Sequence, residues 1–436
     1  MSHNSLNLTT MSLAIAAALG SIATCARADP LDDMRADVDA LRGKIADLEK
    51  AQRAPDGSGA SNVVTGGATK GSFKLPGSNT SVTLGGYVKL DAIFSNPSAG
   101  VGSNADQELE AGNIPVGSTA KSNERSQVKL HARQTRLFAG TSTPTPWGDL
   151  STYVEGDFFG ANGNETASNS NGFRMRHAYG TIGGLLAGQT WTTFSDVAAY
   201  PETLDFGGPV GLVFARQAQI RWTQPFAKGQ WSIAVENPET IAALANGTQF
   251  RADDDRAPDV AGIVRFDTAT GKYSIAGIAR QLRVDSASAP ASRAQKFGAA
   301  LGVNGVVPLF GTDDVRFSAY YGNGIGRYSI GFLSDAVLDA SGKIALPRQW
   351  LATVAYRHFW TPTLRSTVAL SGVGSSSPVG TAGTVNRNAE SAHLNLIWSP
   401  IARTNLGVEY IFGRREIQSG ETGSLNRVQV SAQYSF

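Results

Sequence analysis

The chain is poor in cysteine, in charge and in long apolar runs. It has one cysteine, Cys25, among 436 residues, which excludes a disulfide framework and a zinc site built from several cysteines. No run of about 18 apolar residues occurs, so a membrane protein built from helices is excluded as well. Charged residues make up 17% of the chain, against ~25% in ordinary soluble proteins. The net charge of +2 gives no reason to expect a nucleic-acid partner.

What the chain does have is glycine, at 49 of 436 positions. Its length fits two or three soluble domains or one large β-barrel. A glycine-rich chain with little charge and no long apolar run is either a soluble all-β protein or an outer-membrane barrel. Composition alone does not separate the two.

The N-terminus carries the pattern of an export signal. A short apolar run at residues 11–23 is followed by Ala26-Arg27-Ala28, an A-x-A cleavage signature. We therefore interpret residues 1–28 as a secretory signal peptide. The alternatives are a buried N-terminal helix and a lipoprotein signal ending at Cys25. With A-x-A cleavage the exported chain would contain no cysteine, which suits an oxidising compartment.

Residues 29–53 carry apolar side chains at the spacing 3-4-3-4-3, typical of the seam of a coiled coil. The seam residues are Leu31, Met34, Val38, Leu41, Ile45 and Leu48. Fewer than three heptads associate weakly, so we expect a periplasmic coiled coil that adds to contacts made elsewhere. The alternative is an amphipathic helix packed on its own domain. Residues 54–72, rich in glycine, serine and alanine, are predicted to be a flexible linker.

From residue 73 to 436 the pattern changes to period 2. In residues 81–95, for example, Leu84, Leu90 and Phe94 share one face, and Lys89 and Asp91 share the other. We count about sixteen such strands. Short turns, such as 143–146, alternate with polar loops at about 96–125, 161–171, 238–257, 322–347 and 374–387. The pattern predicts an all-β, transmembrane antiparallel β-barrel of about sixteen strands. A soluble β-sandwich is the alternative, but the repeated polar faces would leave it without a common core.

Four segments together resemble a known family. They are residues 131–160, 173–194, 201–211 and 216–226, and the terminal aromatic Phe436 also resembles the end of outer-membrane barrels. The segments resemble the DcaP-like family of trimeric outer-membrane channels. The resemblance implies a homotrimer of sixteen-stranded barrels in a Gram-negative outer membrane, uptake of dicarboxylates and related small anions, a periplasmic N-terminal coiled coil, and a loop folded into each pore.

Basic side chains dominate the predicted polar faces. Because a charge facing lipid costs roughly 2–4 kcal/mol at the bilayer midplane, these side chains should point into the lumen. Arg133 and Arg136 share one face only if the strand has a bulge near Gln134. We expect about half of the lumen arginines to be paired with acidic residues. The residues expected to line the path of an anion are Lys89, Lys129, Arg133, Arg136, Arg174, Arg176 and Arg221.

Residues 194–215 are expected to form a loop that constricts the pore. Gly207, Gly208 and Pro209 provide a sharp turn. Glu202 and Asp205 would face the arginine wall and create a transverse field. The alternative is an external surface loop.

Catalytic and cofactor signals are few. The five histidines are scattered, and no H-E-x-x-H, G-x-S-x-G or phosphate-loop motif occurs. We expect no enzyme activity, no metal and no cofactor. The alternative is a barrel enzyme whose catalytic serine and histidine come from different strands, because such a site leaves no sequence motif. The predicted function is facilitated diffusion of small organic anions, dicarboxylates above all. The alternatives are a general or phosphate-type porin and a barrel that attaches the envelope to periplasmic partners through residues 29–53.

Overall fold

The computed structural model describes residues 39, 42–44, 64–97, 106–122, 125–161, 166–169, 171–252, 255–285, 294–339, 341–376, 378 and 380–436. The chain divides into two units, residues 1–65 and 66–436. The predicted signal peptide and the six seam residues of the predicted coiled coil lie outside the described residues. Residues 39 and 42–44, which stand between seam residues in the sequence, are helical. The second unit begins at Gly66, inside the segment predicted as a linker.

Sixteen antiparallel strands form the wall of the second unit, if the collinear β3 and β4 are counted as one. In chain order they are β2 (Ser81–Asn96), β3 (Gln127–His131) with β4 (Arg136–Thr145), β5 (Gly148–Asp157), β6 (Arg174–Ile182), β7 (Leu185–Trp191), β8 (Arg216–Phe226), β9 (Gly229–Glu236), β12 (Asp259–Thr268), β13 (Gly271–Val284), β14 (Ala294–Pro308), β15 (Asp314–Asn323), β18 (Arg348–Thr361), β19 (Leu364–Ser375), β20 (Asn386–Trp398), β21 (Thr404–Ile417) and β22 (Thr422–Ser435). A two-residue strand, β1 (Phe73–Lys74), pairs with the start of β2.

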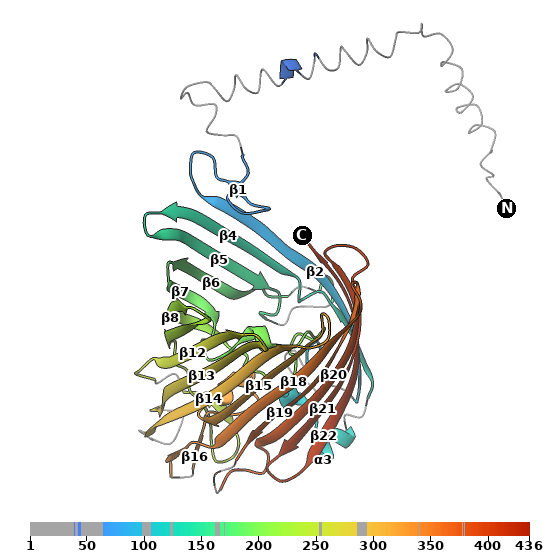
Figure 1. The fold of residues 1–436 in the computed structure, drawn as a ribbon. Helices are drawn as coiled ribbons and strands as arrows, with labels where there is room; N and C mark the ends of the chain where they lie inside the picture. The colour runs from blue at the N-terminus through green and yellow to red at the C-terminus, as the bar shows by residue number, and fades with distance from the viewer. Residues whose placement is uncertain are drawn as a thin grey trace, which may run out of the picture. The chain divides into compact units, whose positions relative to one another are not determined.

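The sheet closes because its first and last strands pair. β2 pairs with β22 along residues 87–96, and on its other side with β4 in its first half and β3 in its second half. Figure 1 shows the blue β2 beside the red β22. Closure leaves no open edge, which a barrel in lipid requires. The prediction of a closed sixteen-stranded barrel is confirmed.

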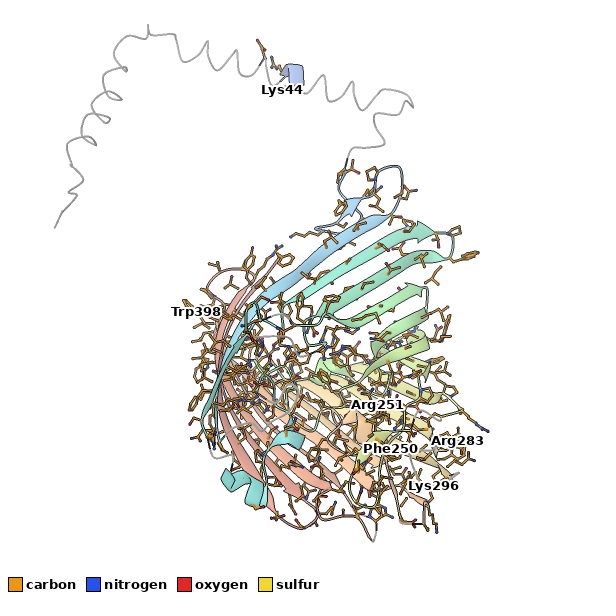
Figure 2. All side chains as sticks on the ribbon, turned by 180° about the vertical axis from the view of Figure 1, so that it is seen from behind. Lys44, Phe250, Arg251, Arg283, Lys296 and Trp398 are labelled. Carbon is orange, nitrogen blue, oxygen red and sulfur yellow. The ribbon has the colours of Figure 1, made fainter. Side chains whose placement is uncertain are left out.

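The period-2 pattern separates a lipid face from a lumen face. In β2, Lys89 and Asp91 are buried, whereas Leu84, Leu90 and Phe94 on the other face are exposed. The outer face is therefore apolar, as contact with acyl chains demands. Aromatic side chains stand on this face near the strand ends, among them Trp398 on the outside of the wall (Figure 2).

The strand connections differ in length at the two ends of the barrel. Short turns join the strands at one end, which places this end in the periplasm. The turn residues are 146–147, 183–184, 227–228, 269–270, 309–313, 362–363 and 399–403. The turn predicted at 143–146 is shifted, because β4 continues through Thr145 and pairs with β5 to its end. Among the described residues, no helix combines the length and apolarity needed to cross a bilayer.

Longer loops join the strands at the opposite end, except between β21 and β22, which are joined there by the short turn 418–421. Two of these connections form a small sheet of β11 (Gln249–Arg251), β10 (Ile241–Ala243), β16 (Ala336–Leu338) and β17 (Ile344–Ala345). We call this sheet, with the residues that connect it to the wall (237–252 and 324–339), the cap. The connection that follows β2 contains η2 (Ala111–Asn113) and α3 (Gly117–Ser122), and we call its described residues 106–122 the first loop.

Candidate functional site: the inner loop and the arginine wall

The connection between β7 and β8 lies inside the barrel. We call residues 192–215, which include η3 (Val197–Ala199), the inner loop. The Leu204 carbonyl accepts hydrogen bonds from Lys89 Nζ at 2.7 Å and Gln429 Nε2 at 3.0 Å. The Gly211 amide donates to Ser371 Oγ at 2.8 Å. Because these partners stand on β2, β22 and β19, the loop crosses the lumen to the wall opposite its own strands.

Two glycines let the inner loop follow this path. A Cβ on Gly211 would lie 2.3 Å from both the Ala352 and the Gly372 carbonyl oxygens, so only glycine fits against this wall. The chain turns just after the predicted position, where the Leu212 amide donates to the Pro209 carbonyl at 3.3 Å. Gly208 has φ of +62°, which glycine adopts at little cost. Its amide donates to Asp205 Oδ2 at 3.0 Å.

Other loops pack on the inner loop from the side of the long connections. Phe194 and Val213 of the inner loop belong to one buried apolar cluster with Ile114 of the first loop and Ile325 and Tyr328 of the cap. These five side chains have essentially no exposed surface. The outer part of the lumen is therefore filled by loops, and any path for a solute is narrow there.

Three arginines and two carboxylates cover the wall at β4 to β6. Arg174 binds Asp157 through Nε at 3.0 Å and Nη2 at 2.9 Å. Arg176 bridges Glu155 at 2.7 Å and Asp157 at 2.9 Å, and Arg136 lies 3.5 Å from Glu155. A register shift beside Glu155 leaves Arg176 as the extra residue, which brings it to Asp157 beside Arg174.

The predicted bulge near Gln134 is a complete break between β3 and β4. The break turns Arg133 inward, where its Nε donates to the Phe158 carbonyl at 3.1 Å and its guanidinium lies 4.8 Å from the Phe159 ring centre. Arg133 is only 1% exposed. Lys129 pairs with Asp106 at 3.1 Å. Lys89 pairs with Asp91 at 3.2 Å. These three residues, which were expected to line the path of an anion, are thus bound by groups of the protein itself.

β8 contributes two arginines without a carboxylate partner among the described residues. The buried Nε of Arg221 donates to no hydrogen-bond partner among the described residues, and the same holds for the buried Nε and Nη2 of Arg216. Arg216 lies over two rings, 4.3 Å from Trp191 and 5.0 Å from Phe214. Its sequence position at the end of a loop gave no sign of this role. We call Arg136, Arg174, Arg176, Arg216 and Arg221 the arginine wall.

The arginine wall has an uncompensated positive charge. Its five guanidiniums face Glu155, Asp157 and Glu236, an excess of two positive charges. Glu236 is itself held by neutral donors, the Thr192 hydroxyl at 2.7 Å and the Thr193 amide at 2.6 Å. Such a wall attracts anions and repels cations.

The acidic residues of the inner loop do not face the arginine wall, in contrast to the expectation. Glu202 binds Arg365 on β19 at 2.6 Å and lies 3.6 Å from Arg357 on β18. Asp205 lies 3.6 Å from Arg427 on β22. Sequence reasoning missed Arg427, although it stands in phase with the polar Gln429 and Ser431 of its strand. Both carboxylates fasten the loop to the far wall.

The first loop brings one more carboxylate to this region. Glu108 is buried, and burial, with Asp205 and Glu110 nearby, raises its pKa to about 8 against the opposing effect of Arg174 and Arg133. Glu108 is therefore mostly uncharged below pH 8 and becomes charged above it. Among the described residues, no group of three or more histidines and carboxylates could hold a metal ion.

We expect the electrostatic preference of the arginine wall for anions over cations to fall as pH rises from 6 to 9. Ionisation of Glu108 adds a negative charge beside Arg133 and Arg174, which cancels part of the positive field. Reversal potentials at the two pH values measure the effect, which should be a few-fold in the permeability ratio. The E108Q variant should lose this dependence; an unchanged pH profile in E108Q would assign the titration to another group.

Comparison with known proteins agrees with this architecture. A family model described as DcaP outer membrane protein matches residues 64–436. The outer membrane channel DcaP of Acinetobacter baumannii superposes with a TM-score of 0.71 at 23% identity, covering 85% of this chain and all of that one. Two other porins share the fold. OmpF of Salmonella typhi superposes with a TM-score of 0.53 at 11% identity, covering 82% of this chain and 98% of that one. The trimer form of OmpT of Vibrio cholerae superposes with a TM-score of 0.51 at 11% identity, covering 82% of this chain and 99% of that one. Curated protein sequences give no significant match.

The family match covers most of the chain and the whole of the barrel. The chain belongs to the DcaP outer membrane protein family and is an outer-membrane channel, not an enzyme.

Proposed function

We propose that this channel carries small organic anions, dicarboxylates above all, across the outer membrane by facilitated diffusion. The observation that carries the proposal is the arginine wall, where two guanidiniums have no carboxylate partner among the described residues. A guanidinium fork binds a carboxylate through two parallel hydrogen bonds. A solute with two carboxylates carries twice the charge of a monocarboxylate of the same size, so the positive field of Arg216 and Arg221 attracts it about twice as strongly.

The remaining predicted contacts have a supporting role in this proposal. Lys89, Lys129 and Arg133 are engaged by protein groups, so they add to the field rather than bind the solute directly. Arg174 and Arg176 both bind Asp157. A passing anion competes with Asp157 for these two arginines, and the exchange lets it leave again, as conduction requires.

Liposome swelling tests the substrate class. Reconstituted channel should admit succinate faster than an uncharged sugar of similar size, because the wall concentrates the anion. Phosphate at the same concentration separates carboxylate preference from a general preference for anions. Equal rates for succinate and the sugar would contradict the proposal.

We also propose that the channel is a homotrimer. Solved porins of the same fold include a trimer form, that of OmpT of Vibrio cholerae. A barrel in lipid presents a broad apolar wall against which two further copies can pack. A high-mass band on a mild detergent gel that converts to monomer on heating would support the trimer; a monomer band alone would contradict it.

A further inference from the structure

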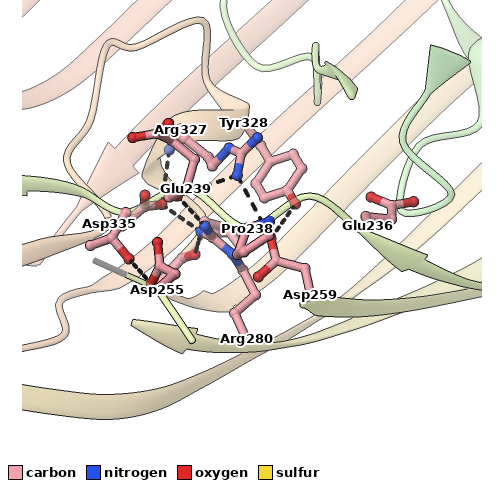
Figure 3. Close-up of polar contacts among 12 residues, drawn as sticks. Glu236, Pro238, Glu239, Asp255, Asp259, Arg280, Arg327, Tyr328 and Asp335 are labelled. Carbon is pink, nitrogen blue, oxygen red and sulfur yellow. Dashed lines mark hydrogen bonds and ion pairs between the residues drawn. The ribbon is translucent and has the colours of Figure 1, made fainter. Parts of the chain in front are cut away.

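Arg280 occupies a position that anion transport does not explain. It lies on β13, it is 2% exposed, and its guanidinium points into the lumen between the wall and the cap (Figure 3). Nε donates to Asp259 at 2.9 Å, Nη1 to Asp335 at 2.8 Å, and Nη2 to the Glu239 carbonyl at 2.6 Å. Nη1 also donates to the carbonyl of Gly324. One side chain thus binds wall strand β12 and both halves of the cap.

The two halves of the cap depend on the same carboxylate. Asp335 accepts from the Ile241 amide at 2.9 Å and from the Arg327 amide at 3.0 Å while it binds Arg280. The cap strands themselves are two or three residues long and share few backbone hydrogen bonds. A sheet this small is not stable alone in water. The ionic cluster therefore holds the cap in place together with an apolar cluster, in which Ala242 and Leu338 of the cap pack with Leu282 of β13.

The cluster continues from the cap to the base of the inner loop. Tyr328 follows Arg327 in the cap, and its carbonyl accepts from the Phe214 amide of the inner loop at 2.9 Å. The Arg327 guanidinium binds the side chain of Gln217, which in turn binds Glu236. Glu236 accepts from the Thr193 amide at the start of the inner loop. Hydrogen bonds therefore run without a gap from Arg280 to both ends of the inner loop.

We propose that Arg280 is a positioning residue that locks the cap and the inner loop into one arrangement and thereby sets the size limit of the pore. The wall strands have their own ladder of hydrogen bonds, so the barrel does not need this residue. Without the guanidinium, Arg327, whose Nη1 lies 3.8 Å from Asp259, is the cation left beside Asp259 and Asp335, and water must enter to solvate these two buried carboxylates. The cap then keeps only its apolar contacts with the wall and becomes mobile, and the inner loop loses its hydrogen-bonded support on that side.

The experiment uses uncharged solutes, so that its outcome does not depend on the proposed anion preference. Full-length channel carrying R280M is reconstituted, and liposome swelling is measured with a series of sugars of increasing size. Single-channel conductance is recorded in parallel. We expect R280M to admit sugars that the unchanged channel excludes and to conduct at least twofold more, with added substates. R280K keeps the charge and one or two of the bonds, and should restore most of the original size limit.

Two further variants serve as controls. They separate the loss of the hydrogen bonds of Arg280, which tether the cap, from a change in net charge and from a general loss of structure. R280M combined with D335N removes one charge of each sign, and it should still widen the pore because the tether is gone. Arg283 stands three residues along the same strand and pairs with Asp285 near the loop end of the barrel (Figure 2), so R283M should keep the original size limit. If R280M does not assemble, the size limit and conductance of R280M with D335N test the proposal instead. An unchanged size limit and conductance in an assembled variant without Arg280 would overturn the proposal.

Discussion

Replacing Arg216 and Arg221 together with glutamine should reduce the chloride-to-potassium permeability ratio by roughly twentyfold in dilute salt. One unit charge about 8 Å from an ion in water-like surroundings changes its energy by about 0.5 kcal/mol. This is roughly a factor of two for each ion and about fivefold in the ratio of the two ions. The two guanidiniums have no carboxylate partner among the described residues, so their loss is not offset within the wall. Reversal potentials under a KCl gradient measure the ratio.

A matched pair of substitutions serves as the control for this prediction. Arg174 and Asp157 bind each other through two hydrogen bonds, so R174Q with D157N removes one charge of each sign. The net charge of the wall is unchanged, and the permeability ratio should change by less than about twofold. If the paired variant lost as much selectivity as R216Q with R221Q, the excess charge would not be the cause.

Replacing Arg427 with methionine should loosen the junction between the inner loop and the first loop. Asp205 accepts from the Leu109 amide at 3.0 Å and lies 3.6 Å from Arg427, and both side chains are buried. Removing one partner of a buried ion pair costs about 3–5 kcal/mol. Burial raises the pKa of Asp205 and Arg427 opposes this effect, so without Arg427 the carboxyl takes up a proton more readily. The full loss in the free energy of unfolding is therefore expected in alkaline buffer, where Asp205 is charged.

Denaturant titration in lipid vesicles measures this change in the free energy of unfolding. R427M with D205N leaves no buried charge at the junction and should recover most of the loss. Conductance should rise in R427M and return towards its original value in the double variant. A free energy of unfolding within about 0.5 kcal/mol of the original for R427M would contradict the assignment of Asp205 as a charged anchor.

The barrel could be predicted because the residues that face lipid are apolar and recur at every second position of the strands. In β2 Leu84, Leu90 and Phe94, which the pattern placed outside, are exposed, and Lys89 and Asp91 are inside. Turn positions were less certain: Pro144 lies in β4 rather than in a turn, because an edge of the ladder near the barrel rim tolerates proline. The break between β3 and β4 was predicted only as a bulge.

The pairing of the arginines could not be predicted, because it depends on register and on where loop tips bind. Arg174 and Arg176 meet the same carboxylate, Asp157, through a register shift that sequence spacing does not reveal. Glu202 crosses the lumen to reach Arg365, 163 positions later in the chain. Arg280 was missed for a different reason. Its neighbours on the inner face, Ile278 and Leu282, are apolar because they pack under the loops, so β13 lacks the polar alternation that marked the other strands.

The reversal potential of the unchanged channel in a planar bilayer under a KCl gradient tests the central claim most directly. The excess of two positive charges on the arginine wall predicts a potential of the sign that selective chloride flow produces. Raising the salt concentration should reduce the selectivity, because screening shortens the reach of these charges to about 3 Å at 1 M. A potential of the opposite sign, showing preference for potassium, would contradict an anion channel.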